Sequence, residues 1–159
     1  MNFFKCLQTL RLNQHQAAEL FSVQVERFRN WYWQNKAVPT VSEHIDRLTR
    51  ALDQQVDLWL QQIQKHHQQE GLLALPVYGN YFDFHASDPD FAEALCYFLP
   101  LYHSFTQKLI AALFNLGIKA KTVVIDFDDY STWLTENDFE NCISARIMFA
   151  GLKLNKKIK

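Results

Sequence analysis

The chain has 159 residues, of which 48% are hydrophobic and only four each are glycine and proline, so it can bury a core. This composition excludes an intrinsically disordered protein and allows one domain or two small ones. The formal net charge of −1 gives no overall attraction to nucleic acid, although the charges are unevenly distributed.

The front of the chain is basic and the back is acidic. Residues 1–52 hold seven basic and four acidic side chains, whereas residues 71–150 hold four basic and ten acidic ones. The net charges are therefore +3 and −6, and the last nine residues, GLKLNKKIK, add +4. This distribution fits a DNA-binding head joined to an assembly or sensor body, but a net charge of +3 is modest and also suits acidic partners of other kinds.

The cysteines and the first residues predict a cytoplasmic protein. The three cysteines, Cys6, Cys96 and Cys142, lie far apart and outside any C-x-x-C pair, which favours a reducing compartment. The starting sequence MNFFKCLQTLRLNQ lacks a charged segment followed by a long apolar run, so we expect no signal peptide. No apolar stretch approaches the roughly 18 residues of a membrane span.

The first part of the chain predicts three short helices. The first covers residues 2–10 and carries an apolar face. The residues of this face are Phe3, Leu7 and Leu10. Asn13 is a suitable N-cap for a second helix over 14–21, and Ser22 occupies the turn position. A third helix is predicted over 24–34.

A long amphipathic helix follows a short connection. Pro39 prevents the third helix from running on, and the long helix is predicted to start near Ser42 and to stop at Gly71. Its apolar stripe holds for more than six turns. The stripe consists of Val41, Ile45, Leu48, Leu52, Val56, Trp59 and Ile63. A helix of roughly 28 residues is about 42 Å long. Its second half therefore needs cover from the C-terminal region or from a second copy of the chain.

The remaining chain predicts a mixture of helices and strands. Residues 72–78 suit a strand, and a turn signal follows at 79–80. A second turn signal at 87–90 is expected to lead a short helix. Residues 95–100 fit either a strand or a helix. A helix is predicted over 100–115 because Pro suits its first turn and five apolar residues share a face. These residues are Leu101, Phe105, Leu109, Ala112 and Leu113.

The last predicted elements are a strand and a helical stretch. Leu116-Gly117 ends the preceding helix, and residues 121–127 form the clearest strand because they are rich in β-branched side chains. The stretch 129–149 is predicted to be helical, with Thr135 or Asn137 as its cap. The fold class is therefore mainly α with a small β component, an α+β protein.

Six residues near the front have the spacing of two helices joined by a tight turn. They are Gln14, Ala18, Leu20, Val23, Phe28 and Trp31. The small side chain of Ala18 lets the second helix cross the first closely. The opposite face of that second helix presents polar and basic groups, which suits the major groove of DNA. This stretch resembles the helix-turn-helix of the lambda-repressor-like (Xre-type) DNA-binding fold.

The residues after this motif extend the resemblance. The run WYWQNKAVP (31–39) is similar to the WExGxxxVP ending of such regulators, with Tyr32 in place of Glu and Gln34 in place of Gly. The whole layout resembles most closely the small phage and bacterial regulators that include anti-CRISPR-associated autorepressors. That resemblance implies a homodimeric, cytoplasmic repressor of bacterial or phage origin that binds an inverted repeat in double-stranded DNA. A small-molecule effector is left unknown.

The resemblance implies four segments. Residues 1–52 are expected to form the helix-turn-helix domain, and 53–71 the continuation of the long connecting helix. Residues 72–150 are expected to form an α+β dimerisation or sensor domain, and 151–159 a basic tail. We expect no enzymatic activity, cofactor, metal or membrane partner, because the chain carries no recognisable phosphate-binding, nucleophile or metal-ligand motif.

Roles at the DNA follow from position. Gln14 matches the position that binds a phosphate in the resembling family. Val25 and Glu26 lie in the first turn of the recognition helix, where Val25 suits a thymine methyl group and Glu26 a cytosine amino group. Arg29 lies one turn later and suits guanine or phosphate. Asn30 suits adenine or the DNA backbone.

The flanking residues complete the predicted DNA-binding set. Gln24 begins the recognition helix. Arg27 points more to the side and suits a phosphate or a neighbouring carboxylate. Asn35 and Lys36 follow the helix and suit phosphate contacts. Trp33 is either a flank of the core or an aromatic side chain near the groove, and the core is favoured.

Two alternatives place the main function in the C-terminal half. In the first, this half is a ligand- or protein-binding module of antitoxin type, whose aromatic residues line a pocket or an interface. Packing of these residues in the core is favoured over that role. These residues are the run 78–84 and Tyr97, Phe98, Tyr102 and Phe105. In the second, three carboxylates after the last strand serve a metal-assisted enzyme. They are Asp126, Asp128 and Asp129, whose simpler role is a strand end and helix cap.

Overall fold

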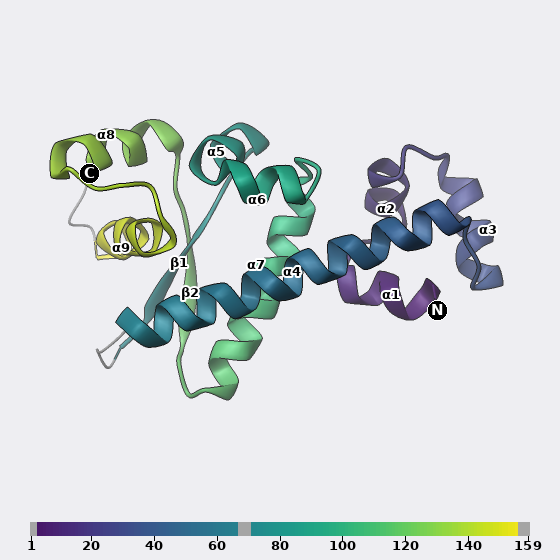
Figure 1. Cartoon of the computed structure of the whole chain (residues 1–159), viewed down its shortest axis with the longest axis horizontal. Helices are drawn as coiled ribbons and strands as arrows, with labels where there is room; N and C mark the ends of the chain where they lie inside the picture. Colours follow the sequence, from purple (N-terminus) through teal and green to yellow (C-terminus); the bar gives the residue numbers. More distant parts are fainter. Residues whose placement is uncertain (1–2, 67–70, 156–159) are drawn as a thin grey trace.

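The computed structural model describes residues 3–66 and 71–155 and is mainly helical, with two short parallel strands. The molecule is elongated (Figure 1). Three short helices, α1 (Phe3–Leu10), α2 (Gln14–Leu20) and α3 (Val25–Gln34), gather at one end. The strands lie toward the other end with α8 (Phe127–Asn137) and α9 (Ile143–Leu154). The long helix α4 (Pro39–His66) runs between the two groups and joins them. Within the described residues, no helix has the length and apolar character needed to cross a membrane.

The three predicted front helices are confirmed as α1 (Phe3–Leu10), α2 (Gln14–Leu20) and α3 (Val25–Gln34). The predicted cap is also confirmed. The Asn13 side chain accepts a hydrogen bond from the backbone N–H of Gln16 at 2.8 Å, and the Gln16 side chain accepts one from the N–H of Asn13 at 3.0 Å. This reciprocal capping box satisfies two backbone donors at the start of α2.

Two non-glycine residues with positive φ shape the turns around α3. Ser22 lies between α2 and α3 with φ 54°, at the turn position expected from the sequence. The motif WExGxxxVP places its glycine at Gln34, but Gln34 remains helical here. Asn35 instead takes the left-handed conformation with φ 51° and ends the helix. Asn adopts this conformation more readily than most residues, which explains why the glycine is dispensable.

The long helix α4 (Pro39–His66) has 28 residues and begins three residues earlier than predicted. Pro39 therefore starts the helix instead of separating it from α3. This position suits proline because the first turn of a helix needs no N–H donor. The predicted stripe is buried at Ile45, Leu48, Leu52, Trp59 and Ile63. The predicted stop at Gly71 cannot be compared, because residues 67–70 lie outside the described part.

The second half of the α4 stripe is covered by the C-terminal region of the same chain. Helices α7 (Leu99–Asn115) and α9 (Ile143–Leu154) pack against α4. The Trp59 ring lies edge-on to the Phe105 ring with 5.3 Å between centroids, and both side chains are buried. The stripe therefore gives no support to a second copy of the chain at this surface.

Both predicted strands are confirmed. Strands β1 (Leu73–Val77) and β2 (Ala120–Val124) form a parallel pair in which Leu73 is opposite Ala120 and Val77 is opposite Val124. Three helices connect them, namely α5 (Tyr81–Ser87), α6 (Pro89–Ala94) and α7. Helix α9 packs against β1, whose first four residues are buried.

The stretch 129–149 is mostly helical, as predicted, but it forms two helices and the predicted caps are wrong. The structure has α8 (Phe127–Asn137) and α9, separated at Asp138, which takes a positive φ of 54°. The cap of α8 is Asp126, whereas Thr135 and Asn137 lie inside the helix. Helix α9 continues to Leu154, so the first residues of the predicted basic tail are helical.

Only the last two residues of the segment 95–100 are helical, at the start of α7, and the rest is neither strand nor helix. Cys96 and Tyr97 both have positive φ, 54° and 57°, and form a turn before α7. Helix α5 was not predicted at all. Its cap, Asn80, accepts a hydrogen bond from the N–H of Asp83 at 2.9 Å. A turn signal at 79–80 and a helix cap at Asn80 look alike in sequence, because Asn favours both.

The aromatic residues of the rear half mostly pack the core. Tyr78, Phe84, Tyr102 and Phe105 are buried and contact one another, with neighbouring ring centroids 4.8 to 5.6 Å apart. The Tyr102 hydroxyl donates to the Pro76 carbonyl at 2.7 Å, which joins α7 to β1. For these four side chains the structure confirms core packing, the role that the sequence favoured over a pocket lining.

Candidate nucleic-acid interface

The outward face of α3 is open. Helix α3 packs mainly against α2, and Figure 1 shows it at the tip of the molecule, away from α8 and α9. Phe28 is buried and Trp31 is half-buried, so the opposite side of α3 faces outward. The exposed residues of α3 and its cap are Gln24, Glu26, Arg27, Arg29, Asn30, Trp33 and Gln34. None of them is inserted into the rear half of the chain.

The residues at the start of α3 lie partly in the core and partly at the surface. Gln24 caps the helix through its extended backbone, and its side chain makes no capping bond and is exposed. Glu26 is exposed, as its predicted contact with a base requires. Val25 is half-buried and packs against the core. Only part of its side chain therefore remains for the predicted thymine contact.

Arg29 and Gln14 are joined across the two helices. The Arg29 Nε atom donates a hydrogen bond to Gln14 Oε1 at 3.2 Å. Gln14 begins α2 and is half-buried, whereas Arg29 lies one turn into α3 and is exposed. The structure thus brings together two residues that the sequence assigned to separate roles.

Arg27 is directed to the side of α3, as predicted. Its guanidinium carbon lies 5.4 Å from the centroid of the Trp31 ring, a distance typical of a cation–π contact. The charge remains exposed and the contact limits the positions that it can occupy. This placement suits a phosphate beside the groove better than a base inside it.

The residues after Arg29 also lie at the surface. Asn30 is exposed on the outward face. Asn35 and Lys36 are exposed just beyond the helix, where the backbone N–H of Lys36 donates to the Trp31 carbonyl at 3.0 Å. Trp33 is 78% exposed, so its predicted place at the flank of the core is wrong. The core lies on the Phe28 side, and Trp33 falls on the other side of the helix.

The acidic residues after β2 act as a helix cap and as ion-pair partners. Asp126 accepts a hydrogen bond from the N–H of Asp129 at 2.8 Å. Lys153 Nζ lies 3.7 Å from Asp126 and 3.2 Å from Asp129. The pKa of Asp126 is lowered, chiefly by the bond from the Asp129 backbone and further by the Lys153 charge. In residues 3–66 and 71–155, no group of three or more His, Cys, Asp or Glu side chains is placed to hold a metal ion.

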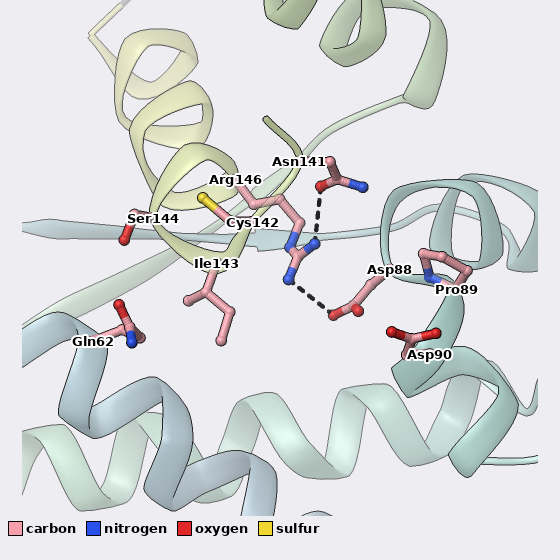
Figure 2. Close-up of a pocket in the computed structure, with 9 residues that line it drawn as sticks. All are labelled: Gln62, Asp88, Pro89, Asp90, Asn141, Cys142, Ile143, Ser144 and Arg146. Carbon is pink, nitrogen blue, oxygen red and sulfur yellow. Dashed lines mark hydrogen bonds and ion pairs between the residues drawn. The ribbon is translucent and has the colours of Figure 1, made fainter. Parts of the chain in front are cut away.

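A buried ion pair lies beside a cavity in the rear half (Figure 2). Arg146 is 5% exposed and its Nη2 atom lies 3.3 Å from Asp88 Oδ2. Its Nη1 atom donates to the carbonyl of Ser87 and to the side chain of Asn141, both at 3.0 Å. Burial raises the pKa of Asp88, and the Arg146 charge opposes that shift. The pair thereby connects the α5–α6 junction to α9.

The cavity beside this pair has a volume of about 380 Å³. It lies between α4, the start of α6 and the start of α9. Its lining residues are Gln62, Asp88, Pro89, Asp90, Asn141, Cys142, Ile143, Ser144 and Arg146. The sequence prediction missed this site. The available signal was a single arginine between Ala145 and Phe149 on a helix that is otherwise apolar there.

The chain matches no protein-family model, and a comparison with curated proteins finds no significant match.

Proposed function

We propose that this protein is a sequence-specific DNA-binding transcriptional regulator that inserts the outward face of α3 into the major groove. One observation carries the proposal: α3 packs on α2 across a tight turn and leaves a polar and basic helix face exposed. Glu26, Arg29 and Asn30 lie on this face, and donors and acceptors of these types pair with base edges in the major groove. The excess of basic residues in the segment 1–52 supports attraction to phosphate.

The proposed regulator acts as a homodimer on an inverted repeat and represses transcription. Dimers of helix-turn-helix proteins place two recognition helices about 34 Å apart, one turn of DNA. The support for two copies is this general geometry, since the α4 stripe is covered within one chain. The dimer surface must therefore lie elsewhere on the molecule.

The proposal is tested by selecting bound duplexes from a random pool, sequencing them and measuring affinity for the selected duplex at several salt concentrations. We expect an inverted-repeat consensus and an affinity that falls steeply with salt, because bound phosphates release counterions. The test variant has Glu26, Arg29 and Asn30 all changed to Ala. These substitutions keep the helix but remove its polar face, so the variant should bind the selected duplex more weakly. Equal affinity of this variant for the selected duplex would refute the proposal.

A second candidate function is a ligand- or protein-binding module in which the rear half carries the main activity. The cavity beside Arg146 favours it, because a buried charge next to an open volume is a common feature of small-molecule sites. A metabolite that co-purifies with the chain and raises its melting temperature would support this reading. A chain that purifies without any bound molecule and melts at the same temperature with metabolite mixtures would count against it.

A further inference from the structure

Trp33 is the most exposed large hydrophobic side chain in the described part of the chain, at 78%. Its ring contacts Tyr32 edge-on, with 5.9 Å between the centroids. Tryptophan is usually well buried, because exposing its large apolar ring to water is unfavourable. An indole left in solvent at the tip of the molecule is therefore available to a partner.

Trp33 shares a helix face with the proposed base-contacting residues. It follows Glu26, Arg29 and Asn30 by seven, four and three positions, the spacings that align side chains along a helix. It lies roughly 10 Å further along the α3 axis than Glu26. In helix-turn-helix proteins the N-terminal residues of the recognition helix contact the bases. The C-terminal end of α3 then lies at the rim of the groove, beside the sugar–phosphate backbone.

The surroundings of Trp33 favour DNA over a second copy of the chain. Arg27, Arg29 and Lys36 are exposed on α3 and just beyond it, which complements phosphate. A twofold contact between two copies would place the same surface against itself and bring these positive charges together.

We propose that the Trp33 indole packs against deoxyribose at the rim of the major groove and anchors the C-terminal end of α3 to the duplex. This inference rests on the proposed DNA-binding function. The contact is apolar and independent of base sequence, so it contributes affinity without discriminating between sequences.

The test compares the affinities of the full chain and of Trp33→Ala for the selected duplex and for an unrelated one, over a range of salt concentrations. We expect Trp33→Ala to weaken binding to both duplexes roughly tenfold. The slope of log affinity against log salt stays unchanged, because no charge is removed. Lys36→Ala, which removes a positive charge, is expected to reduce that slope by about one. Trp33→Phe keeps an aromatic ring and should recover part of the loss.

The matched control is Phe114→Ala, which removes a ring of similar exposure, 72%, from the end of α7. This variant is expected to bind both duplexes like the unchanged chain. Wild-type affinity of Trp33→Ala, or an altered salt slope, would overturn the Trp33 contact while leaving the proposed function intact. Loss of a homodimer in Trp33→Ala without DNA would also overturn it, by assigning the ring to a protein interface. Absence of binding by the unchanged chain would refute both proposals.

Discussion

Arg29 Nε donates a hydrogen bond to Gln14 Oε1 at 3.2 Å, which joins α3 to the first turn of α2. Gln14 is partly buried and fixed at a helix start, so the bond limits the directions that the Arg29 side chain can take. Orienting an arginine before binding reduces the entropy that it loses when it pairs with guanine or phosphate. The two residues are therefore expected to act as one unit.

A double-mutant cycle with Gln14→Ala and Arg29→Ala tests this coupling. If Arg29 pairs with a base, Arg29→Ala should weaken binding to the selected duplex by about 1–3 kcal/mol. Gln14→Ala should weaken it as well, because Arg29 loses its orientation. The double variant should lose less than the sum of the two, as expected for residues in direct contact. Strictly additive losses, measured by fluorescence anisotropy, would show that the bond has no role in binding.

The left-handed conformation of Ser22, in the turn between α2 and α3, predicts that two substitutions at this position differ in their effect on stability. Its φ of 54° lies in the left-handed region, which glycine adopts without strain and β-branched residues strongly disfavour. Ser22→Val should lower the free energy of unfolding by about 1–2 kcal/mol, whereas Ser22→Gly should change it little. Urea denaturation measures both variants. Equal stability of the two would contradict the left-handed turn.

Because Arg146 and Asp88 form a buried ion pair, we expect that replacing Arg146 lowers the free energy of unfolding and that a second substitution at Asp88 restores part of it. Arg146→Met leaves the Asp88 carboxylate buried without its partner and should cost about 3–5 kcal/mol of unfolding free energy. Adding Asp88→Asn removes the unpaired charge and should recover much of that loss. The comparison is made by urea denaturation at neutral pH. A double variant no more stable than Arg146→Met would show that the charge pair is not the cause.

The cap of α8 predicts a pH dependence. The pKa of Asp126 in the folded state lies below its ordinary value of 3.8, chiefly because the ionised carboxylate accepts the Asp129 N–H. Its contribution to stability is present above that ordinary value and is lost as the pH falls through the folded-state pKa. Asp126→Asn should therefore reduce stability at neutral pH, and the difference should shrink in acid. Melting temperatures from pH 2 to 7 measure this, and a difference that grows in acid would contradict it.

The sequence predicts a helix or strand correctly where a clear pattern of side chains runs along it. The α4 stripe follows a helical period and β2 is rich in β-branched residues, and both elements lie within a few residues of the predicted bounds. The cap at Asn13 was also readable, because its side chain and that of Gln16 bond locally. The predicted bounds of an element are wrong where the backbone conformation of a single residue ends a helix. Asp138 breaks the last helical stretch through a positive φ that its sequence context does not reveal.

The contacts between residues far apart in the sequence could not be predicted for either site. The individual residues Gln14 and Arg29 were predicted, but their hydrogen bond depends on how α2 and α3 cross. The ion pair of Arg146 and Asp88 joins residues 58 positions apart, and no local pattern connects them. Trp33 was misplaced because a run of three aromatic residues, 31–33, must occupy several faces of one helix.

An NMR titration of the 18.7 kDa chain with the selected duplex, followed through the backbone amides, tests most directly whether α3 enters the DNA. We expect the largest shifts in residues 24–36, with smaller shifts at the start of α2 around Gln14. Large shifts confined to the rear half, with residues 24–36 unchanged at saturation, would contradict the claim that α3 enters the DNA.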